Sequence, residues 1–143
     1  SKGNTISSKN YTVTKAKGRK NVGKYTYKVT FKNEYKGIKA KTLTFKINPK
    51  ATKITSLTKG KKSFTVKWSK KTTQTTGYQI YYSTSKTRTN GKQITISKNT
   101  TTKKTISKLK GGKKYYVWVR TYKTVDGKKY YSDWSSKKSK KTK

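Results

Sequence analysis

The 143-residue chain carries 40 Lys and Arg against three Asp and Glu, which gives a formal net charge of +37 at pH 7. It has no His and no Cys, so it lacks the side chains that most often carry acid–base catalysis or bind transition metals, and its three carboxylates, Glu34, Asp126 and Asp133, form no cluster in the sequence. This composition predicts a protein that is not an enzyme and needs no cofactor or metal, with polyanions as its expected partners.

The first third of the chain alternates apolar residues with Thr and Lys, a period of two that predicts half-buried β-strands. Three or four strands are expected in residues 1–48, near Tyr11–Val13, Lys24–Phe31 and Lys41–Ile47. Pro49 lacks an amide donor and ends the last of these strands, so we place a domain boundary there, with residues 49–51 as a linker. A segment with so few strands is barely large enough to be stable by itself.

The same alternation continues through residues 52–143 and predicts a second, larger β domain. The alternating stretches are Phe64–Trp68, Tyr78–Tyr82, Ile94–Ile96 and Tyr115–Val119. Turn-forming pairs separate the strands: Lys59-Gly60, Asn90-Gly91, Gly111-Gly112 and Asp126-Gly127, the last of which suits a type I′ hairpin. No useful helical stripe and no run of 18 apolar residues occurs, so the chain is predicted to be all-β, with tandem β-sandwich modules, and not to insert into a membrane.

Several landmarks stand in a defined order in residues 52–143. Ile54–Leu57 suits a first strand, Trp68 ends a second, and Tyr78 begins the inward row of a third. Leu109 stands six residues before Tyr115, which is the spacing of a tyrosine corner. In these residues the chain resembles a fibronectin type III domain. The resemblance implies a β-sandwich with structural roles for Trp68, Tyr78, Leu109 and Tyr115.

The stretch Tyr131-Ser-Asp-Trp-Ser135 resembles half of the Trp-Ser-x-Trp-Ser motif of related receptor modules, in which the indole stacks with arginines of the neighbouring strand. The resemblance implies a structural cation–π contact between Trp134 and Arg120. The last strand departs from the family pattern, because Ser136–Lys143 contains no apolar residue. It is expected either to be short or to leave residues 137–143 as a loose basic tail.

Four stretches of the first domain share a second pattern: Asn10-Tyr-Thr-Val, Lys20-Asn-Val-Gly-Lys-Tyr, Glu34-Tyr-Lys-Gly-Ile and Lys41–Pro49. They resemble the C-terminal half of a bacterial immunoglobulin-like repeat. The resemblance implies that the front strands of this module either precede Ser1 in a longer surface protein or come from another chain. Both resemblances imply a repetitive, extracellular envelope protein of a Gram-positive bacterium.

One face of the second domain is the best candidate for specific recognition. If Tyr115, Val117 and Val119 point inward, the residues between them point outward and form an aromatic face with a tyrosine of the neighbouring strand: Tyr81, Tyr116, Trp118, Arg120 and Tyr122. A row of exposed aromatic rings surrounded by Lys can stack on sugars or unpaired bases. Alternatively, these side chains cover each other as cross-strand pairs around Arg120, or the first domain docks on them.

Lysine dominates the basic residues, since only Arg19, Arg88 and Arg120 are arginine. Lysine is a hydrated point charge without the planar fork that reads phosphate or guanine, so diffuse adhesion is expected. The predicted polyanion-binding lysines are Lys110, Lys113, Lys114, Lys128, Lys129, Lys137, Lys138, Lys140 and Lys141. Their predicted partners are anionic polymers of a cell wall or host: teichoic acid, sulphated glycan or, without specificity, nucleic acid.

Two other readings of the charge and of the first domain stay open. The lysines could simply form a solvated surface that keeps the protein soluble. The protein could also be a structural spacer or a self-assembling stalk or fibre subunit that associates through the incomplete first domain, with strands donated between chains.

Overall fold

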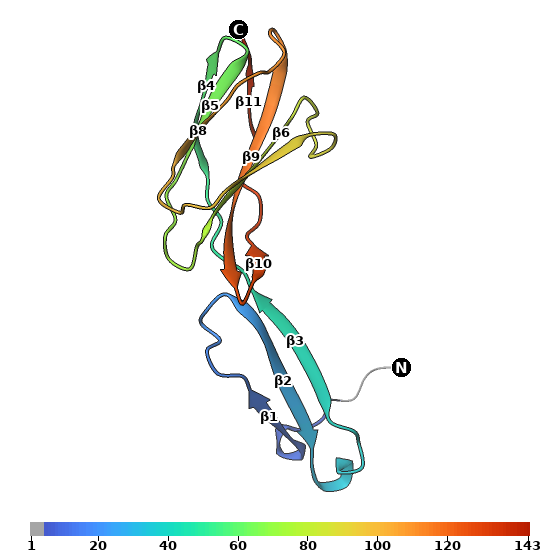
Figure 1. Ribbon diagram of the computed structural model, residues 1–143. Coiled ribbons are helices and arrows are strands. Elements are labelled where there is room, and N and C mark those ends of the chain that lie inside the picture. The colour runs from blue at the N-terminus through green and yellow to red at the C-terminus, as the bar shows by residue number, and fades with distance from the viewer. Residues whose placement is uncertain (1–4) are drawn as a thin grey trace. The chain divides into compact units, whose positions relative to one another are not determined.

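The computed structural model describes residues 5–143 and shows an all-β protein, as the alternating pattern predicts (Figure 1). The chain divides into two compact units, Ser1–Ile47 and Asn48–Lys143, which are named unit 1 and unit 2 below. The segment expected to be a linker is held to unit 2, because the Thr121 hydroxyl donates a hydrogen bond to the Lys50 carbonyl at 2.8 Å.

Unit 1 contains an antiparallel sheet in the order β1-β2-β3. Its strands are β1 (Tyr11–Lys15), β2 (Gly23–Phe31) and β3 (Lys41–Ile47), close to the ranges expected from the sequence. Two short 3-10 turns, η1 (Ser8–Asn10) and η2 (Asn33–Tyr35), flank one end of the sheet. The Asn10 side chain links these turns, because its Nδ2 donates to the Glu34 carboxylate at 3.2 Å and its Oδ1 accepts from the Asn33 side-chain Nδ2 at 3.0 Å.

The strand register gives unit 1 one apolar face. Directly paired residues of an antiparallel sheet share a face. The apolar face of unit 1 consists of Tyr11, Val13, Tyr25, Tyr27, Val29, Phe31, Leu43, Phe45 and Ile47, with Lys15 and Lys41 at its margin. The opposite face of the three strands carries only Thr and Lys. No second sheet covers the apolar face within the described part of unit 1, and Val13 and Leu43 remain 40% and 49% exposed.

Unit 2 is a sandwich of two antiparallel sheets (Figure 1). The smaller sheet has the order β4-β5-β8, with β4 (Ile54–Gly60), β5 (Ser63–Trp68) and β8 (Lys103–Ile106). The larger sheet has the order β10-β9-β6-β7, with β10 (Lys128–Tyr131), β9 (Lys114–Val125), β6 (Gly77–Ser83) and β7 (Lys92–Ile96). A further strand, β11 (Lys138–Lys141), pairs with the first residues of β9.

The core of unit 2 lies between the two sheets. It contains the inward residues of β5, β6 and β9, all at most 9% exposed: Phe64, Val66, Trp68, Tyr78, Ile80, Tyr82, Tyr115, Val117 and Val119. Rings from the two sheets meet directly, with Phe64 5.9 Å from Tyr82 and Trp68 5.3 Å from Tyr78 between ring centroids. Ile54, Ile106 and Leu109 close the sides of this core.

The Tyr115 hydroxyl closes a loop of the sandwich. It accepts a hydrogen bond from the Lys110 backbone N–H at 3.2 Å, in the geometry of a tyrosine corner. Tyr78 uses its hydroxyl in a similar way, because it accepts from the Lys71 amide at 2.7 Å and lies 2.9 Å from the Asn99 carbonyl. Tyr78 and Tyr115 therefore satisfy their polar ends on loop backbone while their rings fill the core.

One hairpin turn lies where the sequence predicts it, and a second lies two residues away from its predicted position. Asp126 and Gly127 have φ values of 48° and 72° between strands that pair Lys128 with Val125, which is the predicted type I′ hairpin. The turn expected at Lys59-Gly60 lies two residues later, since β4 runs through Gly60 and Gly60 pairs with Ser63. Lys62, with a φ of 44°, takes the left-handed position in its place.

Of the two expectations for the last strand, the short strand is confirmed, and the loose tail over residues 137–143 is wrong. Strand β11 continues the larger sheet, with Lys138 opposite Val117 and Lys141 opposite Lys114. Lys143 then exchanges backbone hydrogen bonds with the β4–β5 turn, donating to Gly60 at 3.0 Å and accepting from Lys62 at 2.9 Å. Backbone pairing holds this segment, and backbone pairing needs no apolar side chain.

Candidate binding surfaces

The aromatic face points away from the core, but it is not open to solvent in the way that the alternative of a stacking surface for sugars or bases requires. Tyr116, Trp118 and Tyr122 are 8%, 5% and 2% exposed, and Tyr81 and Arg120 are half-buried. The structure therefore brings the five predicted residues together and removes most of their surface from water. A row of rings on which a sugar or base stacks needs exposed ring faces, so this surface lacks the geometry for that task.

The segment Tyr131–Ser135 provides much of the cover. It runs beside the middle of β9, between the parts of β9 that pair with β10 and β11. Ser132 and Ser135 each form two hydrogen bonds with one residue of β9. The Ser132 N–H donates to the Thr121 carbonyl and its hydroxyl accepts from the Thr121 N–H, both at 3.1 Å. The Ser135 N–H donates to the Val119 carbonyl at 2.8 Å and its hydroxyl accepts from the Val119 N–H at 3.1 Å. The serines thus take the place of a strand and position Tyr131 and Trp134 above the sheet.

Arg120 is stacked between the two rings that this segment supplies. Its guanidinium carbon lies 3.9 Å from the centroid of the Tyr131 ring and 4.4 Å from that of Trp134. Its Nε and terminal nitrogen donate to the side-chain oxygen of the buried Gln79 at 2.9 and 2.7 Å. Burial lowers the pKa of Arg120, an effect that Tyr131 opposes and Arg88 reinforces, and a guanidinium stays charged regardless.

Further cation–π and ring–ring contacts surround Arg120. The guanidinium carbon of Arg88 lies 5.5 Å from the centroid of the Trp134 ring. The ammonium nitrogen of Lys129 lies 5.2 Å from the centroid of the Tyr122 ring. Tyr81 meets Trp134 and Trp118 edge-on at 6.2 and 5.9 Å. The geometry supports the alternative in which these side chains cover each other, and the Arg120–Trp134 contact that the motif implied is present.

The predicted polyanion-binding lysines fall into groups that lie far apart. Lys128 and Lys129 pair with the last residues of β9, whereas Lys114 begins that strand. A strand of 12 residues spans roughly 36 Å, several times the Debye length of about 8 Å at physiological ionic strength. The two groups therefore act as separate charges. Lys137 and Lys138 are also engaged with the protein, since their ammonium groups donate to the carbonyls of Lys86 and Thr55.

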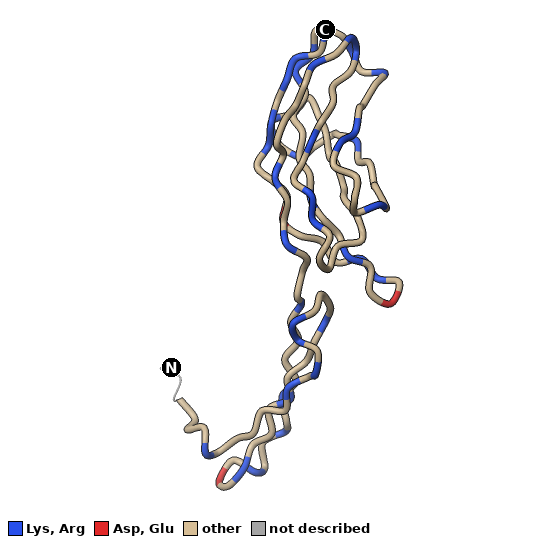
Figure 2. The backbone as a smooth tube through the Cα atoms, turned by 90° about the vertical axis from the view of Figure 1, so that its left-hand side faces the viewer, with Lys and Arg blue, Asp and Glu red and all other residues tan. Residues whose placement is uncertain are grey.

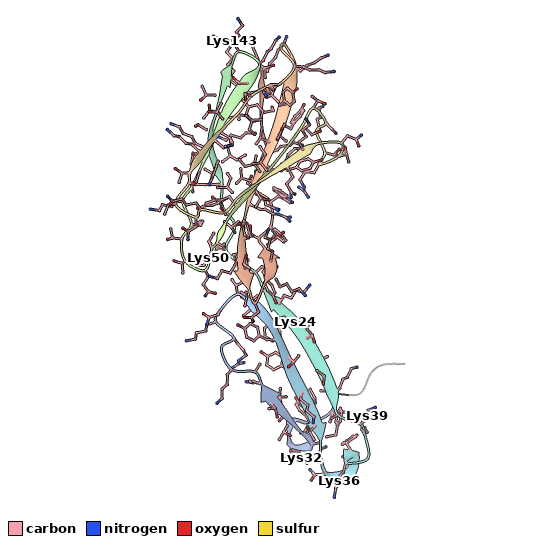
Figure 3. All side chains as sticks on the ribbon, viewed as in Figure 1. Lys24, Lys32, Lys36, Lys39, Lys50 and Lys143 are labelled. Carbon is pink, nitrogen blue, oxygen red and sulfur yellow. The ribbon has the colours of Figure 1, made fainter. Side chains whose placement is uncertain are left out.

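Strand pairing gathers lysines at one end of unit 2. Lys141 lies opposite Lys114, Thr142 N–H donates to the Lys113 carbonyl, and Lys143 bonds to the β4–β5 turn. We call this the basic end of unit 2: Lys61, Lys62, Lys110, Lys113, Lys114, Lys141 and Lys143. Figure 3 labels Lys143 at this end, and Figure 2 shows that other basic residues are distributed along both units. Sequence reasoning missed the combination, because the β4–β5 turn and the C-terminal strand become neighbours only in the fold.

The apolar face of unit 1 is the other surface that invites a partner. A groove of about 450 Å³ runs over it, lined by Tyr11, Val13, Lys15, Tyr27, Val29 and Leu43. Contiguous exposed apolar surface of this kind is typical of interaction sites.

The chemistry of the described residues offers no metal centre and no membrane span. Among residues 5–143, no group of three or more His, Cys, Asp and Glu side chains is placed to hold a metal ion. No helix in this part of the chain is long and apolar enough to cross a bilayer.

The two-sheet core, the tyrosine corner and the serine-bridged Arg–Trp stack define a β-sandwich module of the immunoglobulin-like class. Within that class, residues 48–138 match the fibronectin type III domain, and the chain belongs to this family. Such domains are typically binding or structural modules without catalytic activity, which fits an extracellular or structural role. A comparison with curated proteins finds no match.

Solved structures share the fold. One, described as a myokine structure, is 21% identical, with a TM-score of 0.53, and the match covers 66% of this chain and 97% of that one. The FN1–FN3 domains of chicken CNTN1 are 19% identical, with a TM-score of 0.57, and the match covers 85% of this chain and 43% of that one. At these identities the similarity concerns the fold alone.

Proposed function

We propose that the chain is a non-catalytic extracellular module that adheres to anionic polymers through diffuse lysine charge. The observation that carries the proposal is the basic end of unit 2, where two turns and the last strand bring seven lysines together. None of the three acids belongs to these segments: Glu34 lies in unit 1, Asp126 in the hairpin at the far end of β9, and Asp133 in the segment beside the middle of β9. The resemblance of unit 1 to bacterial immunoglobulin-like repeats supports a place on a Gram-positive cell surface, where teichoic acid is the corresponding polymer.

The physical basis is counterion release. Each lysine that neutralises a phosphate of a polyanion frees a condensed counterion, so affinity falls steeply with salt. About six contacts on duplex DNA would give a log–log slope of about −5. Lysine contributes charge without a fixed fork, so polymers of equal charge density should bind about equally. Teichoic acid, sulphated glycan and nucleic acid are thus alternative ligands of one surface.

The test is a salt titration of binding to wall teichoic acid, heparin and duplex DNA at matched charge density. The expected result is a linear fall of log affinity with log salt for all three polymers. Binding that does not change with salt, or no binding at low salt, would overturn the proposal.

Two charge-matched variants locate the binding. K61Q/K113Q/K141Q removes three lysines from the basic end, and K53Q/K67Q/K103Q removes three exposed lysines from the opposite end of the smaller sheet. Both variants have the same net charge. The first should weaken polymer binding severalfold more than the second, whereas equal losses would place the interaction outside the basic end.

The apolar face of unit 1 favours a second candidate, a structural spacer or self-assembling stalk in which a second copy covers this face with donated strands. Val13 and Leu43 are the exposed residues that such strands would bury. The high net charge opposes association of identical chains, so assembly should increase with salt.

Sedimentation velocity at low and high salt tests this candidate. Filaments or dimers that appear with salt and are lost in Leu43→Lys, but not in Thr44→Lys on the opposite face, would support it. A monodisperse monomer under all conditions would exclude self-assembly.

A further inference from the structure

A hollow of about 520 Å³ opens beside the basic end of unit 2, between the loop after β6 and the loop after β8. It lies where the two sheets separate, so its walls come from both of them. Its lining includes Lys92, Lys108 and Lys110, the core tyrosines Tyr82 and Tyr115, and the backbone turn at Asn90. A volume of this size is within the range of small-molecule sites and suits a unit about as large as one sugar.

The walls of this hollow are fixed by hydrogen bonds. The Ser83 hydroxyl accepts from the Ser85 amide at 3.0 Å and donates to the Thr89 carbonyl at 2.8 Å, which closes the loop after β6. The loop after β8 is held by the Leu109 amide on the Lys62 carbonyl at 2.9 Å and by the Thr142 hydroxyl on the Lys110 carbonyl at 2.7 Å. Binding therefore requires little ordering of the backbone, which lowers its entropic cost.

Gly91 shows how closely the first wall is packed. A Cβ atom at this position would come within 2.6 Å of the Tyr81 ring and against the Tyr82 carbonyl, so no side chain fits. The Gly91 amide donates to the Tyr81 hydroxyl at 2.8 Å, which links the wall to the aromatic face.

The polar groups of the hollow favour an anion. None of the three acids lines it, and no ion pair with its lysines occurs in the described chain. The Tyr82 hydroxyl forms no hydrogen bond with the described residues, and it is not among the side-chain oxygens sealed from solvent. Because Tyr82 lines the hollow and its hydroxyl has no protein partner, this donor is available to a ligand.

We propose that this hollow binds a phosphate or sulphate ester carried on a sugar or polyol, with the ammonium groups of Lys92, Lys108 and Lys110 around the anionic oxygens and the Tyr82 hydroxyl as a hydrogen-bond donor. The flexible lysine stems reach over the opening, while the tyrosine ring and Leu109 supply an apolar floor for the carbon skeleton. Burial, and secondarily Tyr115, raises the pKa of Tyr82, so its hydroxyl keeps its proton at neutral pH.

This inference rests on the proposed function and adds one defined subsite to an otherwise diffuse surface. Lysines elsewhere on the protein attract a polymer as a whole. The hollow would instead recognise one repeating unit, and so it would bind the monomeric ester, for which counterion release from a polymer plays no part.

The experiment is an NMR titration of the whole 15N-labelled chain with glycerol 3-phosphate, with glycerol 3-sulphate and, as the uncharged control on the same skeleton, with glycerol. The expected result is saturable shifts confined to the amides of Asn90–Lys92 and Ser107–Lys110 for the two esters and none for glycerol. A stronger response to the first ester identifies phosphate as the preferred group, and a stronger response to the second identifies sulphate. Shifts that do not saturate, or that spread over lysines throughout the chain, would overturn the inference.

Variants separate the hollow from general charge. K92Q/K110Q should weaken the monomeric ester about fivefold or more, since exposed ion pairs contribute modestly and two are lost, whereas the charge-matched K67Q/K103Q should leave it unchanged. Tyr82→Phe keeps the ring and should weaken binding while the amide spectrum stays folded. Equal affinity in all three variants would exclude this subsite.

The two proposals fail in different ways. If the esters do not bind but the polymers still show their salt-dependent affinity, the subsite is wrong and the adhesion proposal stands. If the polymers do not bind and the esters do, the adhesion proposal is wrong.

Discussion

Unit 1 and unit 2 use the same alternation of apolar residues with Thr and Lys, and they differ in what covers the apolar side. Unit 2 packs two sheets together and buries Phe64, Val66 and Ile80 at 1% exposure or less. In the described part of unit 1, Val22 alone is a buried hydrophobic residue, and the apolar face of its sheet keeps Leu43 49% exposed. The contrast shows that alternation is sufficient to specify a strand, whereas a stable core needs a second layer to receive the apolar side.

The largest expected effect comes from removing one buried or stacked aromatic ring in each unit and comparing the losses in the free energy of unfolding. Phe64→Ala should destabilise unit 2 by about 3–5 kcal/mol, because it leaves a cavity in a closed core. Phe45→Ala should cost unit 1 about 1 kcal/mol, since it mainly removes stacking on Tyr25 and Tyr27. Urea unfolding followed by tryptophan fluorescence reports unit 2 selectively, because Trp68, Trp118 and Trp134 all lie there.

Amide hydrogen exchange supplies the readout for unit 1 in the same samples. If Phe64→Ala does not fold, Phe64→Leu offers a smaller change at the same site. Similar losses in the two units would contradict the view that only unit 2 has a closed core.

The second test concerns the stack that closes the outer side of unit 2, for which unit 1 has no equivalent in its described residues. Arg120→Ala should cost about 2–3 kcal/mol, because it removes the cation between Tyr131 and Trp134 and leaves the buried Gln79 oxygen without its donors. Arg88→Ala removes an exposed cation from one ring and should cost less than about 0.5 kcal/mol.

Arg120→Lys sharpens this test. A lysine cannot stack as a plane or donate twice to Gln79, so we expect little rescue of the urea midpoint. Full rescue by lysine would mean that the charge alone, and not the planar stack, stabilises the face.

Salt should stabilise both units by a smaller amount. Like charges repel in the compact state, and added salt screens them. Between low and moderate ionic strength, we expect the stability of unit 2 to rise by about 1 kcal/mol, which corresponds to about 4–8 °C in Tm for a domain of this size. Calorimetry at several NaCl concentrations measures it, and a flat or falling Tm would show that repulsion does not limit stability.

Alkaline pH should produce the smallest effect, and only in the closed unit. Burial raises the pKa of Tyr82 and of Tyr122 above the ordinary value of 10.0, with further contributions from Tyr115 and Tyr131 respectively. A raised folded-state pKa means that the stabilisation is fully present below pH 10 and is lost as the pH rises through the raised values. The urea midpoint of unit 2 should therefore fall in that window.

The comparison with Tyr82→Phe and Tyr122→Phe isolates the tyrosine contribution. If the variants lose as much stability with rising pH as the original chain, the tyrosines are not responsible.

Strands and core could be predicted because their signals are local. Period-two alternation marked β2, β3, β5, β6 and β9, and the spacing from Leu109 to Tyr115 anticipated the tyrosine corner. The cation–π contact between Arg120 and Trp134 followed from a short motif. In each case a few neighbouring residues determine which way a side chain points, because successive side chains of a pleated strand lie on opposite faces.

The cover over the aromatic face could not be predicted in the same way. The alternation correctly turned Tyr116, Trp118 and Tyr122 away from the core, but exposure depends on what other segments lie above them. Here Ser132 and Ser135 hold an irregular segment along β9 with hydrogen bonds that leave no apolar period in the sequence. For the same reason the sequence could not decide between a short last strand and a loose tail, because main-chain pairing holds the polar residues of β11 in place.

The sequence by itself determined that the protein is cationic and all-β, because composition and residue period are properties of the chain. Only the tertiary structure decided which surfaces remain available. It closed the aromatic face, left the apolar face of unit 1 without a covering sheet among residues 5–47, and joined lysines of two turns and the last strand into one basic end beside a hollow. These outcomes depend on contacts between segments distant in the chain, and neither local period nor net charge encodes such contacts.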